Sequence, residues 1–496
     1  MRCTQEPDPD KPSEGVASTT GSAEAGPEFL LTRSSQSRPL ISFKNVFALA
    51  ASLAAFATVL ALVLPYPVIF YGVRAAHSLL IWRLFLFGTP GWMEGRHHEE
   101  MSWEFRALSV MLFWQDSIDY PFSHPRGFEV MRKEVDRMAT LVPLHKQAKV
   151  QLVDAGGFPA ALVDVRAVAE PSEREKLSEG TLVYFHGGGF SMGSMGGYLG
   201  VGTQMAISFG VTHALVPDYP RIPEAGGLGD VVDGAFVSYL WLLRQLDEAR
   251  RKSTKIICAG ESAGASLCLY ILLQARKHEE ETGEKLRLPD AVILLSPWVW
   301  PGLHSSAPSL SKFKDTDAFC RPRVSKWIMK TFAEAHPGLL AERGNPEGAQ
   351  ISSHSQQISH HFPSLPADLQ PFNLLAAVAE GRLGPDLPPT FVSVGGGELL
   401  LDMGLEFARL LGIPSALVTR SDFVSSGVSP TSDGKASSEI EAEDQIRPCL
   451  EGERGDCLSV VPHMPHVFQC FPSFVKEARE ELLRIRTWLR GLGLSE

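Results

Sequence analysis

The sequence predicts an α/β fold in which a mainly parallel sheet is covered by helices on both faces. Two observations lead to this prediction. Beyond Pro143, short apolar runs alternate with longer amphipathic segments, and the short runs carry almost no charge. Strands that are buried on both faces have this composition. In addition, two glycine-rich motifs each follow one of the apolar runs directly, which places chemistry where a strand ends.

The alternation defines strands and helices in order along the chain. The predicted strands are residues 182–185, 213–216, 256–259, 292–295 and 391–394. The predicted helices are residues 230–248, 265–277, 325–335, 403–411 and 473–489. We expect a catalytic domain over residues 151–496 with two insertions. Residues 301–387 are too long for a simple crossover and predict a helical lid, and the acidic, serine-rich residues 421–455 predict a disordered insertion.

Length and composition exclude several classes of protein. The 496 residues exceed the roughly 250 to 300 that one hydrophobic core supports, so part of the chain must lie outside the core. A net charge of -11 argues against a nucleic-acid partner, because phosphate binding requires clustered Lys and Arg. The seven cysteines include no C-x-x-C pair, and the histidine doublets lack the spacing of a metal site. We therefore expect neither a metal nor a cofactor.

The N-terminal part of the chain predicts a membrane anchor. Residues 1–42 are polar and predict a disordered tail. Residues 45–73 carry no charged side chain, and a helix over 46–64 would rise roughly 29 Å, close to the thickness of a bilayer core. We interpret residues 43–73 as a transmembrane signal anchor, since a cleaved signal peptide, the alternative, begins near residue 1. Residues 74–150 then predict membrane-proximal and lid helices, and we expect a single-pass protein of the endoplasmic reticulum membrane.

The strongest local signal is G-E-S-A-G at residues 260–264, directly between a predicted strand and a predicted helix. In such a strand-to-helix elbow the serine takes a strained, exposed position, and the flanking glycines avoid collisions with neighbouring backbone. Ser262 also lies at a helix N-terminus, where amide dipoles favour negative charge. The motif predicts Ser262 as a nucleophile.

A second motif, H-G-G-G-F at residues 186–190, follows the strand 182–185. Three successive glycines allow backbone N–H groups to approach a tetrahedral oxyanion without obstruction. A flexible turn is one alternative. A phosphate loop is another, but it would end in a lysine, which the following residues lack.

Together the two motifs resemble the hormone-sensitive lipase family of α/β-hydrolases, which includes arylacetamide deacetylases and fungal steryl acetyl hydrolases. The likeness covers residue 182 to the C-terminus, apart from the two insertions. D-Y-P-R-I-P-E at residues 218–224 resembles the family's D-Y-R-L-A-P-E but departs at its third to fifth places. S-P-W-V at residues 296–299 matches, whereas Trp300 stands where the family usually has aspartate. The resemblance implies the α/β-hydrolase fold.

The resemblance also implies the partners of Ser262. G-G-G-E-L-L-L-D at residues 395–402 resembles G-x-x-D-x-L-x-D, which makes Glu398 the acid that orients the histidine and Asp402 the alternative. M-P-H-V-F at residues 464–468 resembles M-P-H-x-F and makes His466 the general base. The expected oxyanion donors are the backbone N–H groups of Gly187, Gly188, Gly189 and Ala263.

These residues predict a serine esterase or lipase that hydrolyses short-acyl esters of apolar alcohols or lipids, acetylated sterols among them. The alternative is a ligand-binding or scaffold protein that has the hydrolase fold without catalysis, since fold does not imply function. Transfer of the acyl group to an alcohol would use the same residues. The expected partners are a small ester or lipid substrate and, through the N-terminal helix, the membrane.

Overall fold

The computed structural model describes residues 127–168, 177–251, 253–302, 305–314, 317–320, 322–341, 358–384, 387–413, 450–451 and 455–495. The predicted tail, the predicted membrane anchor and nearly all of the predicted acidic insertion lie outside these residues, as does much of residues 74–150. Within the described ranges, no helix is both long enough and apolar enough to cross a bilayer.

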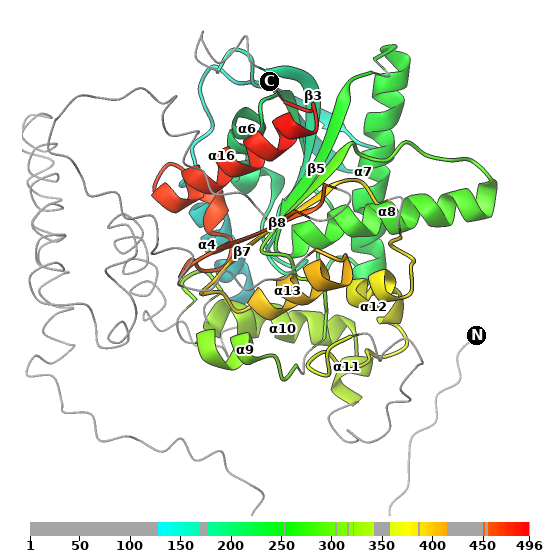
Figure 1. Ribbon diagram of the computed structural model, residues 1–496, viewed down its shortest axis with the longest axis vertical. Helices are drawn as coiled ribbons and strands as arrows, with labels where there is room; N and C mark the ends of the chain where they lie inside the picture. Colours follow the sequence, from blue (N-terminus) through cyan, green and yellow to red (C-terminus); the bar gives the residue numbers. More distant parts are fainter. Residues whose placement is uncertain are drawn as a thin grey trace, which may run out of the picture. The chain divides into compact units, whose positions relative to one another are not determined.

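The described strands form one sheet in the order β1-β2-β4-β3-β5-β6-β7-β9-β8 (Figure 1). From β4 to β9 the neighbours are parallel, whereas β1, β2 and β8 run antiparallel to their neighbours. The prediction of a mainly parallel sheet is confirmed. The strands are β1 (Lys149–Asp154), β2 (Pro159–Asp164), β3 (Ser178–Phe185), β4 (Val211–Pro217), β5 (Lys255–Glu261), β6 (Ala291–Leu295), β7 (Thr390–Gly395), β8 (Leu450–Glu451) and β9 (Cys457–Val461).

Helices cover both faces of the sheet (Figure 1). On one face α6 and α16 enclose a hydrophobic core with the strands, and on the other face α7, α8, α12 and α13 enclose a second one. The helices are α4 (Gly127–Ala139), α6 (Met195–Phe209), α7 (Leu228–Glu248), α8 (Ala263–Thr282), α9 (Pro308–Phe313), α10 (Pro322–Ala335), α11 (Gly338–Ala341), α12 (Leu374–Ala379), α13 (Leu401–Leu410) and α16 (Lys476–Gly491), with short 3-10 turns η5 (Gln370–Phe372) and η6 (Phe468–Cys470).

The described part of residues 301–387 consists of helices and loops, as the sequence predicts. It contributes α9 to α12, and Figure 1 shows α9, α10 and α11 together below the sheet. Helix α10 approaches the glycine loop closely, since a Cβ placed at Gly189 would lie 2.1 Å from Cγ2 of Ile328 on this helix. This segment therefore packs over the carboxyl end of β3, where the predicted site lies.

All five predicted strands and all five predicted helices have counterparts, with ends that differ by a few residues. The elements that were not predicted include β1, β2, β8, β9 and α6. Helix α6 holds four glycines, which lower helix propensity, so its sequence does not favour a helix. Tertiary packing outweighs this preference, because a Cβ at Gly202 would lie 2.6 Å from Val216 on β4. The glycines let the helix lie close to the sheet.

Candidate active site

Ser262 occupies the elbow between β5 and α8, as predicted. Its φ of 55° and ψ of -120° lie in a region that costs strain for a residue with a side chain. The elbow holds the serine because its N–H donates to the Leu295 carbonyl at 2.9 Å. The two motif glycines are required sterically: a Cβ at Gly260 would lie 2.5 Å from Gly264, and a Cβ at Gly264 would lie 2.0 Å from the Phe185 carbonyl oxygen.

His466 lies between β9 and η6 and reaches the elbow from the other end of the chain. Its Nε2 lies 2.9 Å from Ser262 Oγ, within hydrogen-bond distance. The imidazole is buried, and burial lowers the pKa of His466 to about 3. The ring is therefore neutral at physiological pH, which is the form that accepts a proton from a hydroxyl.

Glu398 is fully buried on the Nδ1 side of the imidazole, but its carboxyl group is not hydrogen-bonded to the ring. Its Oε2 lies 3.9 Å from His466 Nδ1. The same oxygen accepts hydrogen bonds from Ser296 Oγ at 2.6 Å and from the Gly395 N–H at 3.1 Å. The pKa of Glu398 is raised well above its usual range: burial and the charge of Asp317 raise it, and the hydrogen bonds from Ser296 and Gly395 lower it. Within the described residues, Glu398 Oε1 and His466 Nδ1 are buried without a hydrogen-bond partner.

Asp402, the alternative acid, is engaged elsewhere. It lies in the first turn of α13, and its Oδ2 accepts the N–H of Ser309 at 2.7 Å. Ser309 belongs to α9, so this carboxylate joins α13 to α9. The geometry favours Glu398 as the partner of His466.

In the glycine loop, residues 186–190, the structure contradicts the predicted role of Gly187 as an oxyanion donor. The N–H of Gly187 donates to Glu261 Oε1 at 2.5 Å, so it is engaged within the protein and does not face the site as an oxyanion donor. The side chain that accepts this N–H is the buried carboxyl group of Glu261, the second residue of G-E-S-A-G. Burial raises the pKa of Glu261 to about 8, while hydrogen bonds from Tyr184 and Gly187 lower it. Sequence reasoning missed this contact, although an acidic residue inside an apolar strand end is a visible signal.

Gly188, Gly189 and Ala263 stay candidates for the oxyanion cradle. Gly188 and Gly189 have φ angles of 102° and 61°, which favour glycine. Both line the cavity beside Ser262. His186, which precedes them, is fully buried and stacks on Tyr219 with ring centroids 4.4 Å apart, so its ring anchors the start of the loop.

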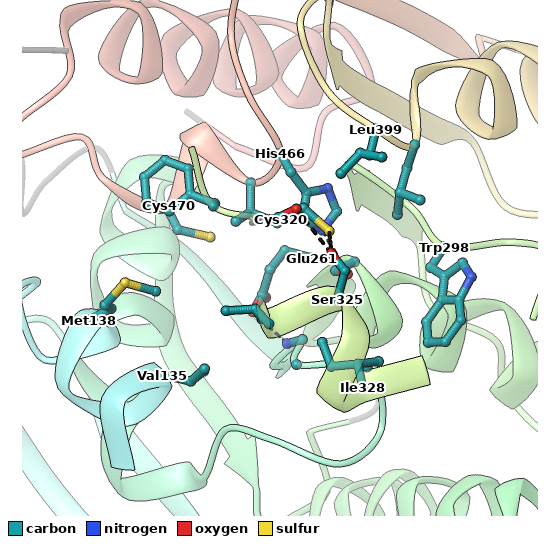
Figure 2. A pocket seen from close by; sticks show the side chains of 18 of the residues that line it. Val135, Met138, Glu261, Trp298, Cys320, Ser325, Ile328, Leu399, His466 and Cys470 are labelled. Carbon is teal, nitrogen blue, oxygen red and sulfur yellow. Dashed lines mark hydrogen bonds between the residues drawn. The ribbon is translucent and has the colours of Figure 1, made fainter. Parts of the chain in front are cut away.

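A cavity of about 240 Å³ surrounds Ser262 and His466. Its lining is mainly apolar and comes from elements far apart in the sequence (Figure 2). Val135 and Met138 of α4 lie at one end, and Trp298 and Ile328 lie at the other. The reactive groups therefore face a mainly apolar chamber with few polar side chains.

Trp300, which replaces the family's usual aspartate, belongs to the core. It is only 2% exposed, its Nε1 donates to the Pro363 carbonyl at 3.1 Å, and its ring lies 5.8 Å from the ring of Phe362. The tryptophan that replaces the aspartate therefore packs against the segment that follows α11.

Comparisons with known proteins agree with this fold. Residues 182–418 match the family described as "alpha/beta hydrolase fold". The chain is 35% identical to LipR of Mycobacterium tuberculosis (strain ATCC 25618 / H37Rv) over 153 residues, 31% of this chain and 43% of LipR. It is 24% identical to Esterase LipI of the same strain over 315 residues, 62% of this chain and 82% of LipI. The structure of EstE7, an HSL-homolog from a metagenome library, superposes with a TM-score of 0.51 at 20% identity, covering 79% of this chain and 99% of EstE7.

The topology and the similarities show that this chain has the α/β-hydrolase fold. Among proteins with this fold, the chain is related to the hormone-sensitive lipase family, as its motifs predict. Relatives that are named esterases and carboxylesterases support the prediction of a carboxylic ester hydrolase. The match spans less than half the length of LipR but more than two thirds of LipI.

Proposed function

We propose that this chain hydrolyses carboxylic esters, with Ser262 as nucleophile, His466 as general base and acid, and Glu398 as the orienting acid. The observation that carries the proposal is the 2.9 Å contact between His466 Nε2 and Ser262 Oγ at a strained strand-to-helix elbow. A serine and a neutral imidazole in contact form the activated nucleophile of acyl transfer.

The reaction proceeds in two halves. Ser262 Oγ attacks the ester carbonyl carbon while its proton passes to His466 Nε2, and the carbonyl oxygen becomes an oxyanion. Backbone N–H groups of Gly188, Gly189 and Ala263 stabilise this oxyanion, each by about 3 kcal/mol. The bond to the alcohol oxygen then breaks, and the alkoxide takes the proton from His466. Water then attacks the acyl carbon and gives a proton to His466. The bond between the acyl carbon and Ser262 Oγ breaks, Ser262 Oγ takes this proton from His466, and the carboxylic acid is released.

We further propose that the substrates are short-acyl esters of apolar alcohols or lipids, acetylated sterols among them. The mainly apolar lining of the cavity supports an apolar alcohol, because burying such surface stabilises the complex by about 25 cal/mol per Å². Helices α9 and α10 act as the lid in this proposal. Turnover of p-nitrophenyl acetate, butyrate and dodecanoate would rank acyl length, and activity that rises toward dodecanoate would contradict the short-acyl preference.

The uncharged residues 45–73 support a single-pass anchor in the endoplasmic reticulum membrane, which would let apolar esters reach the cavity from the bilayer. Alkaline carbonate extraction of membranes tests this proposal. The full chain should stay with the membrane pellet, whereas a chain released into the supernatant would contradict a membrane span.

Ser262→Ala tests the nucleophile. We expect turnover of p-nitrophenyl butyrate to fall by about 10³-fold or more, since an activated serine is required for the acyl-enzyme. Ser238→Ala is the matched control, because Ser238 is buried in α7 and its hydroxyl donates to the carbonyl of Gly234 in the same helix. Unchanged turnover in Ser262→Ala would refute the mechanism.

The 3.9 Å gap between Glu398 and His466 keeps a second function open, a binding or scaffold protein without catalysis. Covalent labelling by a fluorophosphonate discriminates between the two, because only an activated serine reacts. Labelling of wild type that is lost in Ser262→Ala supports the enzyme, and absence of labelling in both supports the scaffold.

A further inference from the structure

We propose that Asp317 is a positioning residue for the reaction. Its carboxylate fixes the backbone of His466, the proposed base, and of Leu399, which follows the proposed acid Glu398. This inference rests on the proposed function. The motif comparison gives Asp317 no role, and the residue lies 149 positions before His466 in the sequence.

One carboxylate joins three segments of the chain. Asp317 Oδ1 accepts the N–H groups of Phe319 and Cys320, both at 3.1 Å, and the N–H of His466 at 3.2 Å. Its Oδ2 accepts the N–H of Leu399 at 2.9 Å. Leu399 directly follows Glu398, so Asp317 bonds the residue next to the proposed acid and the proposed base itself.

The loop between β9 and η6, residues 462–467, carries His466, and it needs such support because its backbone is strained. Val467, next to His466, has a φ of 53°, a conformation that is unfavourable for a β-branched residue. Its N–H donates to Ser296 Oγ at 3.1 Å, and Ser296 in turn donates to Glu398. Two successive N–H groups of the loop are therefore accepted by side chains, one from Asp317 and one from Ser296.

The Asp317 carboxylate is fully buried, and it is satisfied by these N–H groups. Burial raises its pKa to about 6, and the four hydrogen bonds lower it. An uncompensated buried carboxylate would be costly, so the N–H cradle and the carboxylate depend on each other. Replacement by asparagine keeps the shape but turns an N–H donor toward Leu399 or His466, where an acceptor is required.

Asp317 also connects the base to the wall of the cavity. Phe319 and Cys320 both line the chamber, as does His466. The segment that forms this wall and the loop that carries the imidazole thus share one anchor. A displacement of the wall is transmitted to the position of Nε2.

Asp317→Asn and Asp456→Asn form the test pair. Asp456 is equally buried and accepts the N–H of Thr390 at 2.9 Å, at the opposite end of β7 from Gly395. With p-nitrophenyl butyrate, we expect Asp317→Asn to lower kcat by about 10- to 100-fold with KM changed by less than about threefold, because a displacement of about 1 Å costs that much in the chemical step. Asp456→Asn should lower thermal stability without this kcat effect.

If Asp317→Asn does not fold, Asp317→Glu decides. It keeps the charge and the acceptors but moves them by one methylene, so a fall in kcat with unchanged KM is expected. Wild-type kcat in a folded Asp317 variant, or an equal kcat loss in Asp456→Asn, would overturn the inference while leaving the proposed function intact. A wild-type chain that neither turns over the ester nor labels with fluorophosphonate would overturn both.

Discussion

The imidazole of His466 is contacted unequally on its two sides. Its Nε2 lies 2.9 Å from Ser262 Oγ, whereas its Nδ1 lies 3.9 Å from Glu398 Oε2. An orienting acid acts mainly when the imidazole becomes positively charged during the reaction. Active-site hydrogen bonds are often long in the free enzyme and shorten in the transition state. We therefore expect the Glu398 contact to close as the proton arrives on His466.

Comparison of Glu398→Gln with Asp402→Asn tests which carboxylate acts on His466. Glu398→Gln removes the carboxyl group that can stabilise the imidazolium, so we expect kcat to fall by about 10²-fold or more. Loss of charge at Asp402 weakens its bond to the Ser309 N–H and should lower the melting temperature by a few degrees, with a much smaller effect on kcat. Steady-state kinetics and thermal melts of both variants measure these effects, and a larger kcat loss in Asp402→Asn would reverse the assignment.

The close approach of Gly189 to Ile328 leads to a second prediction. In Gly189→Ala the new methyl would lie 2.1 Å from Ile328 Cγ2, at a φ of 61° that costs about 1 kcal/mol without a clash. We expect the loop to shift and kcat to fall, with the oxyanion donors misaligned.

The double variant Gly189→Ala with Ile328→Ala is the control for the clash. Removing the Ile328 side chain clears the space for the methyl, so the double variant should recover part of the lost kcat. Equal kcat values in Gly189→Ala and in the double variant would show that the backbone strain alone, and not the contact with α10, sets the loss.

Burial of Glu261 predicts a pH dependence of stability. Its pKa rises from about 4.5 to about 8 on folding, so between these pH values the folded chain binds a proton that the unfolded chain has lost. Stability is therefore lost as pH rises through this window. Glu261→Gln removes the titration. Urea unfolding at pH 5 and pH 8 should show that the wild type loses stability relative to Glu261→Gln at the higher pH, and the same difference at both pH values would contradict the shift.

The parallel strands and the elbow were predictable because their signals are local. The strand at 256–259 is apolar, and Gly260 and Gly264 stand where backbone contacts exclude a side chain. Strand β1 carries no such signal. It lies at the edge of the sheet as described, where it pairs with β2, and Leu152 on it is 72% exposed. Its composition reflects this edge position, which the sequence alone does not reveal.

The finer details of the site depend on contacts between distant segments. Nothing near Gly187 in the sequence shows that the carboxylate of Glu261 occupies its N–H, because the two residues are 74 positions apart. The contact of Asp317 with His466 spans 149 positions and crosses the predicted lid. Such contacts follow from the folded backbone and not from motif spacing.

The shared anchor at Asp317 has a consequence for protein engineering. Segments that wall a substrate chamber are attractive units for exchange between related enzymes, because they promise new selectivity with an intact reaction centre. Here the exchanged segment would include Asp317, which accepts the hydrogen bond from the backbone N–H of His466. A chimera that replaces residues 317–320 should therefore lose turnover for all esters alike, unless the aspartate is carried over with its spacing.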